Sequence, residues 1–214
     1  MKDYIKKTLL KVLKIDLNIE SLNDFYVWQN IYKFQQPLPQ FVKEIVLNKY
    51  NSKNSIWVET GTYLGRTTKY LSKISHKVYS LEPDNKLFNQ AKKNLNGYAN
   101  VTLFNVSSES GLEEILKRIK KENLCFWLDG HYSGKNTFKG ETDTPINKEL
   151  EIIEKYLDNF LRINILIDDF RLFKKNNNSN EEYPDKTILI NWANKNNMEW
   201  TVESDIFVIQ SKGK

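Results

Sequence analysis

Residues 55–68, Ser-Ile-Trp-Val-Glu-Thr-Gly-Thr-Tyr-Leu-Gly-Arg-Thr-Thr, constrain the fold of this chain more than any other segment. The stretch opens with a β-prone run at residues 56–58, continues through a glycine turn and ends on the start of a helix. Gly61 can adopt the positive φ that a sharp turn needs, and Gly65 lets the following helix pack closely. Backbone N–H groups at such a helix start can hold an anion or a polar ligand, so this segment is predicted to bind one.

Apolar runs and helical patterns alternate regularly after this segment. Strands are predicted at residues 77–81, 101–104, 124–128 and 163–167, and helices at 64–74, 85–95, 109–120 and 145–160. Strands separated by helices imply a parallel sheet with right-handed crossovers. A last helix at 185–196 precedes two strands at 199–203 and 206–210, which Ser204 and Asp205 join as an antiparallel hairpin. We therefore predict a Rossmann-like α/β fold, with a mostly parallel sheet of seven strands, a final antiparallel strand and helices on both faces.

The length of 214 residues, of which 40% are hydrophobic, fits one sizeable core and therefore one domain. Within that domain, residues 1–54 are interpreted as a helical extension and residues 55–214 as the main α/β body. The extension contains a basic, amphipathic helix at residues 3–17 and an aromatic-rich segment, followed by a predicted helix at residues 41–50. We interpret it as a lid or as the surface of a homo-oligomer, and rank contact with a membrane surface lower.

Composition also limits the compartment and the partners. The net charge of +5 is concentrated in residues 1–54, but its basic residues are not interleaved with aromatic ones as in nucleic-acid binders, so no nucleic-acid partner is predicted. The single cysteine, Cys125, excludes an intrachain disulfide and favours a reduced compartment. No export signal and no apolar run of about 18 residues is found, which predicts a cytoplasmic protein without a transmembrane segment.

Polar residues follow the predicted strands at the edge where ligands bind in open α/β sheets. Glu82 comes directly after the second strand, 21 residues past Gly61, where a carboxylate can accept both hydroxyls of a ribose. Asp84 is interpreted as the cap of the next helix. The glycines at positions 61 and 65 do not match the first, third and sixth positions of the dinucleotide fingerprint. This spacing disfavours a nicotinamide cofactor, although an oxidoreductase stays an alternative.

Three acids gather at the ends of the fourth and fifth predicted strands. Asp129 ends the run Phe-Trp-Leu-Asp, and Asp168 with Asp169 ends Leu-Ile-Asp-Asp. Carboxylates that converge in this way repel one another unless a positive charge lies between them. An oxygen-preferring divalent cation such as Mg²⁺ fits that requirement. The alternative is that one acid caps a helix while another pairs with Arg171 or Lys135.

The pattern Glu59-x-Gly61-x-x-x-Gly65 resembles the first motif of class I S-adenosylmethionine-dependent methyltransferases. Together with the three acids, it resembles the metal-dependent O-methyltransferases of the macrocin O-methyltransferase type and, more distantly, the catechol O-methyltransferases. The resemblance covers roughly residues 55–170 and implies that Asp129, Asp168 and Asp169 hold the metal. The residues that it implies at the cofactor are Glu59, Thr60, Gly61, Tyr63, Gly65, Thr67, Glu82, Pro83, Ser107, Ser108 and Asp129.

His131 is the candidate general base, because it follows the metal acid Asp129 by two residues and its ordinary pKa suits proton removal near neutral pH. Asp129 is the other residue assigned to catalysis, as the ligand of the activating metal. Residues 132–143 form a long polar connection, which is interpreted as a lid over the acceptor. The candidate acceptor-binding residues are Tyr132, Lys135, Lys139 and Arg171.

These features predict a methyltransferase that uses S-adenosylmethionine and Mg²⁺, or another divalent cation, to methylate a hydroxyl group. By resemblance, the acceptor is a small molecule such as a sugar, a nucleotide-linked sugar, a glycan precursor or a secondary-metabolite precursor. Two alternatives stay open, an oxidoreductase of the nicotinamide-dependent type and a non-catalytic module that binds S-adenosylmethionine. Fold alone does not distinguish them.

Overall fold

A computed structural model describes residues 19–130, 144–174 and 183–212 of the chain. The chain divides into two compact units, Met1–Asn51 and Ser52–Lys214. No helix in the described ranges is long and apolar enough to cross a membrane.

The first unit contains helices α2 (Ile19–Asn30) and α3 (Gln40–Lys49), and α3 agrees with the predicted helix. Its aromatic side chains pack on one another, with ring centroids 5.1 Å apart for Trp28 and Phe34 and 6.1 Å apart for Trp28 and Phe41. Helix α2 was not predicted, because its apolar residues are spread around the helix instead of forming one stripe. The predicted helix at residues 3–17 lies outside the described residues.

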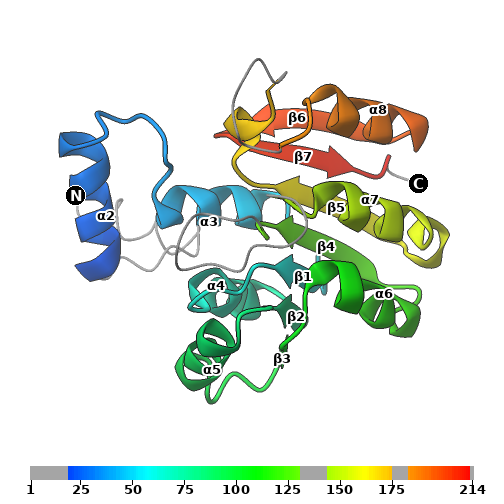
Figure 1. The fold of residues 1–214 in the computed structure, drawn as a ribbon, viewed down its shortest axis with the longest axis horizontal. Helices are drawn as coiled ribbons and strands as arrows, with labels where there is room; N and C mark the ends of the chain where they lie inside the picture. The colour runs from blue at the N-terminus through cyan, green and yellow to red at the C-terminus, as the bar shows by residue number, and fades with distance from the viewer. Residues whose placement is uncertain (1–18, 131–143, 175–182, 213–214) are drawn as a thin grey trace. The chain divides into compact units, whose positions relative to one another are not determined.

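The second unit is built on one seven-stranded sheet with the order β3-β2-β1-β4-β5-β7-β6 (Figure 1). Its strands are β1 (Ile56–Thr60), β2 (Lys77–Leu81), β3 (Val101–Phe104), β4 (Asn123–Leu128), β5 (Arg162–Ile167), β6 (Glu199–Glu203) and β7 (Ile206–Gln210). The first five strands pair in parallel, and β7 pairs antiparallel with both β5 and β6. The predicted fold class is therefore confirmed.

Helices cover the two faces of this sheet (Figure 1). They are α4 (Arg66–Ile74), α5 (Asn85–Asn94), α6 (Ser108–Arg118), α7 (Ile146–Glu154) and α8 (Thr187–Lys195). Helices α6, α7 and α8 share one apolar core with alternate residues of the strands, such as Ile56 and Val58. The intervening residue Trp57 is also fully buried, as expected for a parallel strand that is covered on both faces.

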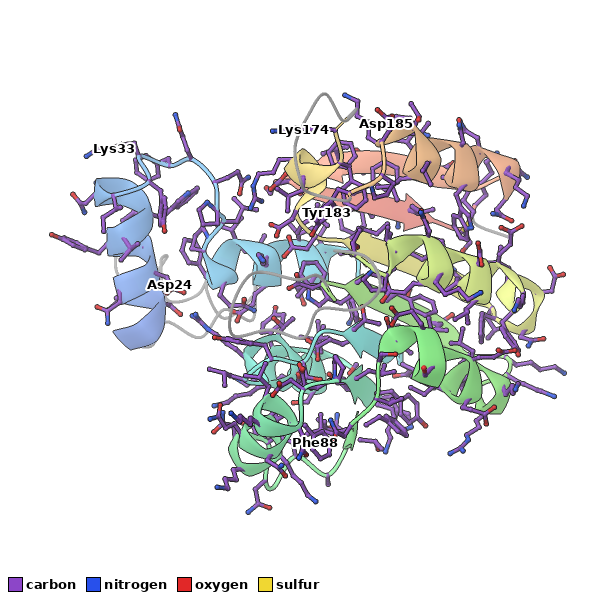
Figure 2. All side chains as sticks on the ribbon, in the orientation of Figure 1. Asp24, Lys33, Phe88, Lys174, Tyr183 and Asp185 are labelled. Carbon is purple, nitrogen blue, oxygen red and sulfur yellow. The ribbon has the colours of Figure 1, made fainter. Side chains whose placement is uncertain are left out.

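Two short 3₁₀ helices flank β5. The predicted helix at 145–160 ends earlier, at Glu154, and η1 (Leu157–Asn159) follows it. Bonds from Tyr156 N to Ile153 O and from Asn159 N to Tyr156 O tighten the chain there, which lets Phe160 enter the core before β5 begins. After β5, the chain forms η2 (Phe170–Leu172) and continues to Phe173. The ring of Tyr183, labelled in Figure 2, meets Phe173 edge-on with centroids 5.3 Å apart.

Candidate functional site

The register of the sheet brings the ends of four strands to one level. Thr60 pairs with Leu81 of β2 and Leu128 of β4, and Leu128 pairs with Ile167 of β5. The residues that follow these strand ends therefore lie side by side along one edge of the sheet. This edge is the ligand-binding edge of open α/β sheets.

The glycine loop after β1 is held against the neighbouring strands. Gly61 has a φ of +85°, and a Cβ at this position would lie 2.6 Å from the Asp129 carbonyl oxygen. Gly61 N and Thr62 N both donate to Leu81 O, at 3.1 and 3.2 Å. The loop thus crosses the end of β4 at a separation that only glycine permits, as the sequence predicts for a tight strand–turn–helix.

Helix α4 begins at the second glycine. Gly65 occupies the N-cap position with a φ of +82°, and a Cβ there would lie 2.8 Å from the side chain of Leu95. Between the two glycines, Tyr63 is 52% exposed and has a φ of +51°. Thr67 lies in the first turn of α4.

Glu59 is fully buried at the penultimate position of β1. Its Oε2 accepts hydrogen bonds from Thr68 Oγ1 at 2.5 Å and Ser80 Oγ at 2.6 Å, and Ser80 also bonds the hydroxyl of Thr62 at 2.6 Å. No described residue hydrogen-bonds Oε1 of Glu59. Burial raises the pKa of Glu59 to about 8, although the two hydroxyl hydrogen bonds act in the opposite direction. Glu59 therefore ties α4 and β2 to β1 as a largely neutral acid at pH 7.

Glu82 follows β2 and joins the glycine loop to the next helix. Its Oε2 accepts from Tyr63 N at 2.8 Å, and its Oε1 accepts from Asp84 N at 3.0 Å. Burial raises the pKa of Glu82, and these two backbone donors lower it. A carboxylate offers about four lone-pair sites, so both oxygens keep acceptor capacity. Asp84 caps α5 through bonds from Lys86 N and Leu87 N, which confirms the predicted cap.

The segment after β3 continues the same edge. The side-chain amide of Asn105 donates to Glu82 O at 2.8 Å and to Pro83 O at 3.2 Å. Ser107 is the N-cap residue of α6, and Ser108, its first residue, is buried. Asn105 thus fixes the positions of Glu82 and Pro83 relative to the two serines that were predicted at the cofactor.

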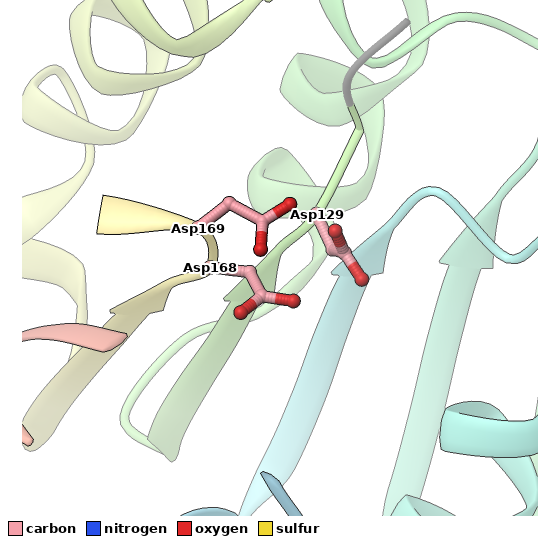
Figure 3. Close-up of side chains that lie close together, drawn as sticks. All are labelled: Asp129, Asp168 and Asp169. Carbon is pink, nitrogen blue, oxygen red and sulfur yellow. The ribbon is translucent and has the colours of Figure 1, made fainter. Parts of the chain in front are cut away.

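The three predicted metal acids do come together (Figure 3). Asp129, Asp168 and Asp169 each have a ligand oxygen within 4.8 Å of the others, and Asp168 is buried. At this separation, two like charges repel by about 3 kcal/mol with an effective dielectric constant of about 20. Positive charge nearby would therefore stabilise the cluster, and its hard oxygen donors suit a Mg²⁺-like cation.

Arg171 supplies part of that charge. Its Nη1 donates to Asp169 Oδ1 at 2.6 Å and makes a short bond with Asp205 Oδ2. The sequence placed Arg171 among the acceptor-binding residues and, as the alternative, in an ion pair with the acids. The structure shows the ion pair.

Glu149 of α7 is a buried acid that was not predicted at the site. It is 1% exposed, and no described residue hydrogen-bonds its Oε1 or the Oγ1 of Thr60. A Cβ on Gly130 would lie 3.3 Å from Thr60 Oγ1 and 3.6 Å from Glu149 Oε1, so both polar atoms face the segment after β4. Burial raises the pKa of Glu149 to about 7, and the nearby hydroxyl of Ser108 partly offsets this rise.

A sequence pattern could have identified Glu149. The buried residues of α7 are Ile146, Glu149, Leu150, Ile152 and Ile153, and all of them except Ile152 have the spacing of one helical stripe. A glutamate in such a stripe must be buried with the apolar residues. The remaining predicted residues, His131, Tyr132, Lys135 and Lys139, lie outside the described residues.

The sheet order, with five parallel strands and a reversed strand inserted next to β5, defines the Rossmann-like fold of class I methyltransferases. No family model matches the chain, and no curated protein matches it in sequence. A solved structure of a proposed rRNA methylase from Clostridium thermocellum is similar, with a TM-score of 0.51 and 13% identity over 77% of this chain and 91% of that chain.

Two further solved structures are also similar to this chain. An rRNA methylase from Streptococcus thermophilus has a TM-score of 0.49 and 18% identity, over 78% of this chain and 92% of that chain. A proposed methyltransferase from Streptococcus mutans in complex with SAH has a TM-score of 0.48 and 17% identity, over 77% and 91%. At these identities, the comparisons describe the fold.

Proposed function

We propose that this protein is an S-adenosylmethionine-dependent methyltransferase that also uses a divalent cation to methylate a hydroxyl group. The observation that carries this proposal is the placement of a glycine loop, the Glu82 carboxylate and three clustered aspartates along one edge of one sheet. A cofactor and a metal bound there would be neighbours, as methyl transfer to an activated oxygen requires.

The residues at the end of β2 fit a nucleoside. Glu82 keeps acceptor capacity for ribose hydroxyls after it has bonded Tyr63 N and Asp84 N. The Gly61 turn passes over the backbone of Asp129, so the loop and the end of β4 border the same space. S-adenosylmethionine supplies an electrophilic methyl group when bound, and the protein contributes binding and orientation.

The aspartate cluster fits one divalent cation. Each of the three carboxylates offers a ligand oxygen within 4.8 Å of the others, and carboxylate oxygens are the hard donors that such a cation prefers. Asp129, Asp168 and Asp169 would hold the ion, whose chemistry is to lower the pKa of a coordinated hydroxyl and to orient its oxygen.

His131 is proposed to accept the proton of the acceptor hydroxyl, since it follows Asp129 by two residues. The acceptor is proposed to be a sugar, a nucleotide-linked sugar, a glycan precursor or a secondary-metabolite precursor, by resemblance to the macrocin O-methyltransferase type. RNA is the competing acceptor, because rRNA methylases are among the solved structures of similar fold.

The cofactor is tested by calorimetric titration with S-adenosylhomocysteine, the demethylated product. We expect wild-type protein to bind it and Glu82→Ala to bind about 10–100-fold more weakly, because hydrogen bonds to a charged group contribute about 1.5–3 kcal/mol. Glu82→Gln keeps one acceptor for the glycine loop and separates loss of charge from loss of loop structure. Glu122→Ala removes an exposed acid and serves as the control. A folded protein that binds no S-adenosylhomocysteine would refute the proposal.

Two further measurements separate the rival functions. Binding of a nicotinamide dinucleotide in place of S-adenosylhomocysteine would favour the oxidoreductase. Binding of S-adenosylhomocysteine without methyl transfer to any acceptor, with or without Mg²⁺, would favour the non-catalytic module. The acceptor panel should pair nucleotide-linked sugars with an rRNA fragment, since methylation of the RNA alone would overturn the proposed acceptor class.

A further inference from the structure

Arg171 belongs to a joint between the segment after β5 and the turn of the β6–β7 hairpin. Besides the two bonds of Nη1, the backbone N of Arg171 donates to Asp205 Oδ1 at 2.7 Å, and Phe170 N donates to Asp205 O at 2.9 Å. Both carboxylate oxygens and the carbonyl of Asp205 therefore bind this segment. Phe170 adds an apolar contact, because its ring stacks on Phe207 with centroids 5.3 Å apart.

This joint fixes the conformation of Asp169. Asp169 has a φ of +54° and Asp205 a φ of +65°, so both residues occupy the left-handed region. Residues other than glycine rarely adopt this backbone region unless surrounding contacts hold them there. The side chain of Asp169 is 13% exposed, that of Asp205 is 7% exposed and that of Arg171 is 33% exposed, so the bridge is partly shielded from water.

The single nitrogen Nη1 makes both ionic contacts. A carboxylate has two oxygens, so Asp169 can keep its bond to Arg171 on Oδ1 while Oδ2 serves as a ligand. Partners that hydrogen-bond a metal-ligating carboxylate orient it, and their loss typically lowers metal affinity about 10–100-fold. Arg171 is such a partner of Asp169, and Asp205 holds Arg171 in place.

We infer that Arg171, locked by Asp205, is a positioning residue that presents the Asp169 carboxylate to a divalent cation, and that it does not bind the acceptor. This inference rests on the proposed metal site. It assigns the β6–β7 turn, which lies far from the cluster in sequence, a direct part in cation affinity.

The test is titration with Mn²⁺, followed by the electron paramagnetic resonance of the free ion, with S-adenosylhomocysteine affinity measured on the same samples. We expect Arg171→Ala and Asp205→Asn to lower Mn²⁺ affinity about 10–100-fold. Arg171→Lys should stay within a few-fold of wild type, because one ammonium can reproduce the two contacts of Nη1. Arg162→Ala, which removes an exposed arginine at the start of β5, should change nothing.

Three results would overturn the inference. The first is Mn²⁺ binding by Arg171→Ala that equals or exceeds wild type, since Arg171 would then act only as a competing charge. The second is a loss of thermal stability or S-adenosylhomocysteine affinity with unchanged Mn²⁺ affinity, which would show a purely structural role. If Arg171→Ala does not fold, Asp205→Asn tests the same claim, because its amide oxygen can still accept from Arg171 N. Wild-type protein that binds S-adenosylhomocysteine but no Mn²⁺ would overturn this inference and the proposed metal site, and leave the cofactor proposal standing.

Discussion

Replacing Glu59 by glutamine should change how the stability of this protein depends on pH. Burial raises the pKa of Glu59 from 4.5 to about 8, so the folded state holds a proton that the unfolded state releases. The resulting penalty on the folded state is absent below pH 4.5, grows as the pH rises and is complete above about pH 8. Each pH unit corresponds to about 1.4 kcal/mol, which gives about 5 kcal/mol as the upper limit of the penalty.

The glutamine variant escapes this penalty because it does not ionise. Its amide oxygen can accept the hydrogen bonds that Thr68 and Ser80 now donate to Oε2. Its amide nitrogen would take the place of Oε1, which no described residue hydrogen-bonds, and an unsatisfied buried donor costs about 1–3 kcal/mol. That cost is independent of pH. The difference between variant and wild type across the pH range therefore isolates the ionisation of Glu59.

The assay is urea unfolding of both proteins at pH 5, 7 and 9. We expect the free energy of unfolding of Glu59→Gln, relative to wild type, to rise with pH by up to about 5 kcal/mol. Glu122→Gln, a change at an exposed glutamate, is the control for a general effect of charge. A difference between Glu59→Gln and wild type that stays constant from pH 5 to 9 would refute the account, because Glu59 would then ionise alike in the folded and unfolded states.

Four other changes test the site. Gly61→Ala should destabilise the fold by at least about 2 kcal/mol through its positive φ and the contact with Asp129 O. Gly97→Ala is the control for backbone strain alone, because φ is +94° there but nothing lies within 4 Å of the new Cβ. An equal loss of unfolding free energy in the two variants, measured in urea, would contradict the clash. The free energy of unfolding of Glu149→Gln, relative to wild type, should rise by up to about 3 kcal/mol as the pH rises from 4.5 through about 7. Urea unfolding measures this difference, and a difference that does not change with pH would contradict the burial of the Glu149 carboxyl. Asp168→Asn should weaken Mn²⁺ binding at least about 10-fold and leave S-adenosylhomocysteine affinity unchanged, so equal Mn²⁺ affinity in the two proteins would remove Asp168 from the metal site. His131→Ala should lower turnover about 100-fold or more with unchanged S-adenosylhomocysteine affinity, whereas loss of both would indicate a structural residue.

The sheet could be predicted because each of its strands is a short run of apolar or β-prone residues bounded by turn residues. Parallel topology then places Glu82, Asp129 and Asp168 at the same edge without any knowledge of side-chain contacts. The meeting of three aspartates follows from the same rule, because β4 and β5 are neighbours that end in register.

Contacts between distant segments could not be read from spacing. The partner of Arg171 stands 34 residues away in sequence and reaches it only because β7 pairs with β5. The sequence motif places Glu59 at the ligand, whereas burial on both faces of β1 directs its Oε2 to hydroxyls of α4 and β2. The end of α7 was also not predicted. Burial of Phe160 ends this helix at Glu154, six residues before the end of the predicted helix.

The insertion of β7 between β5 and β6 sets an order of assembly. Until β7 pairs with it, β5 is an edge strand whose apolar residues Ile163, Ile165 and Ile167 lie beside unpaired backbone groups. The same pairing brings Asp205 to Arg171. The β6–β7 hairpin must therefore be synthesised before Asp169 can be held in place. We expect the nascent chain to form the proposed cation site last and to be most prone to aggregate just before that step.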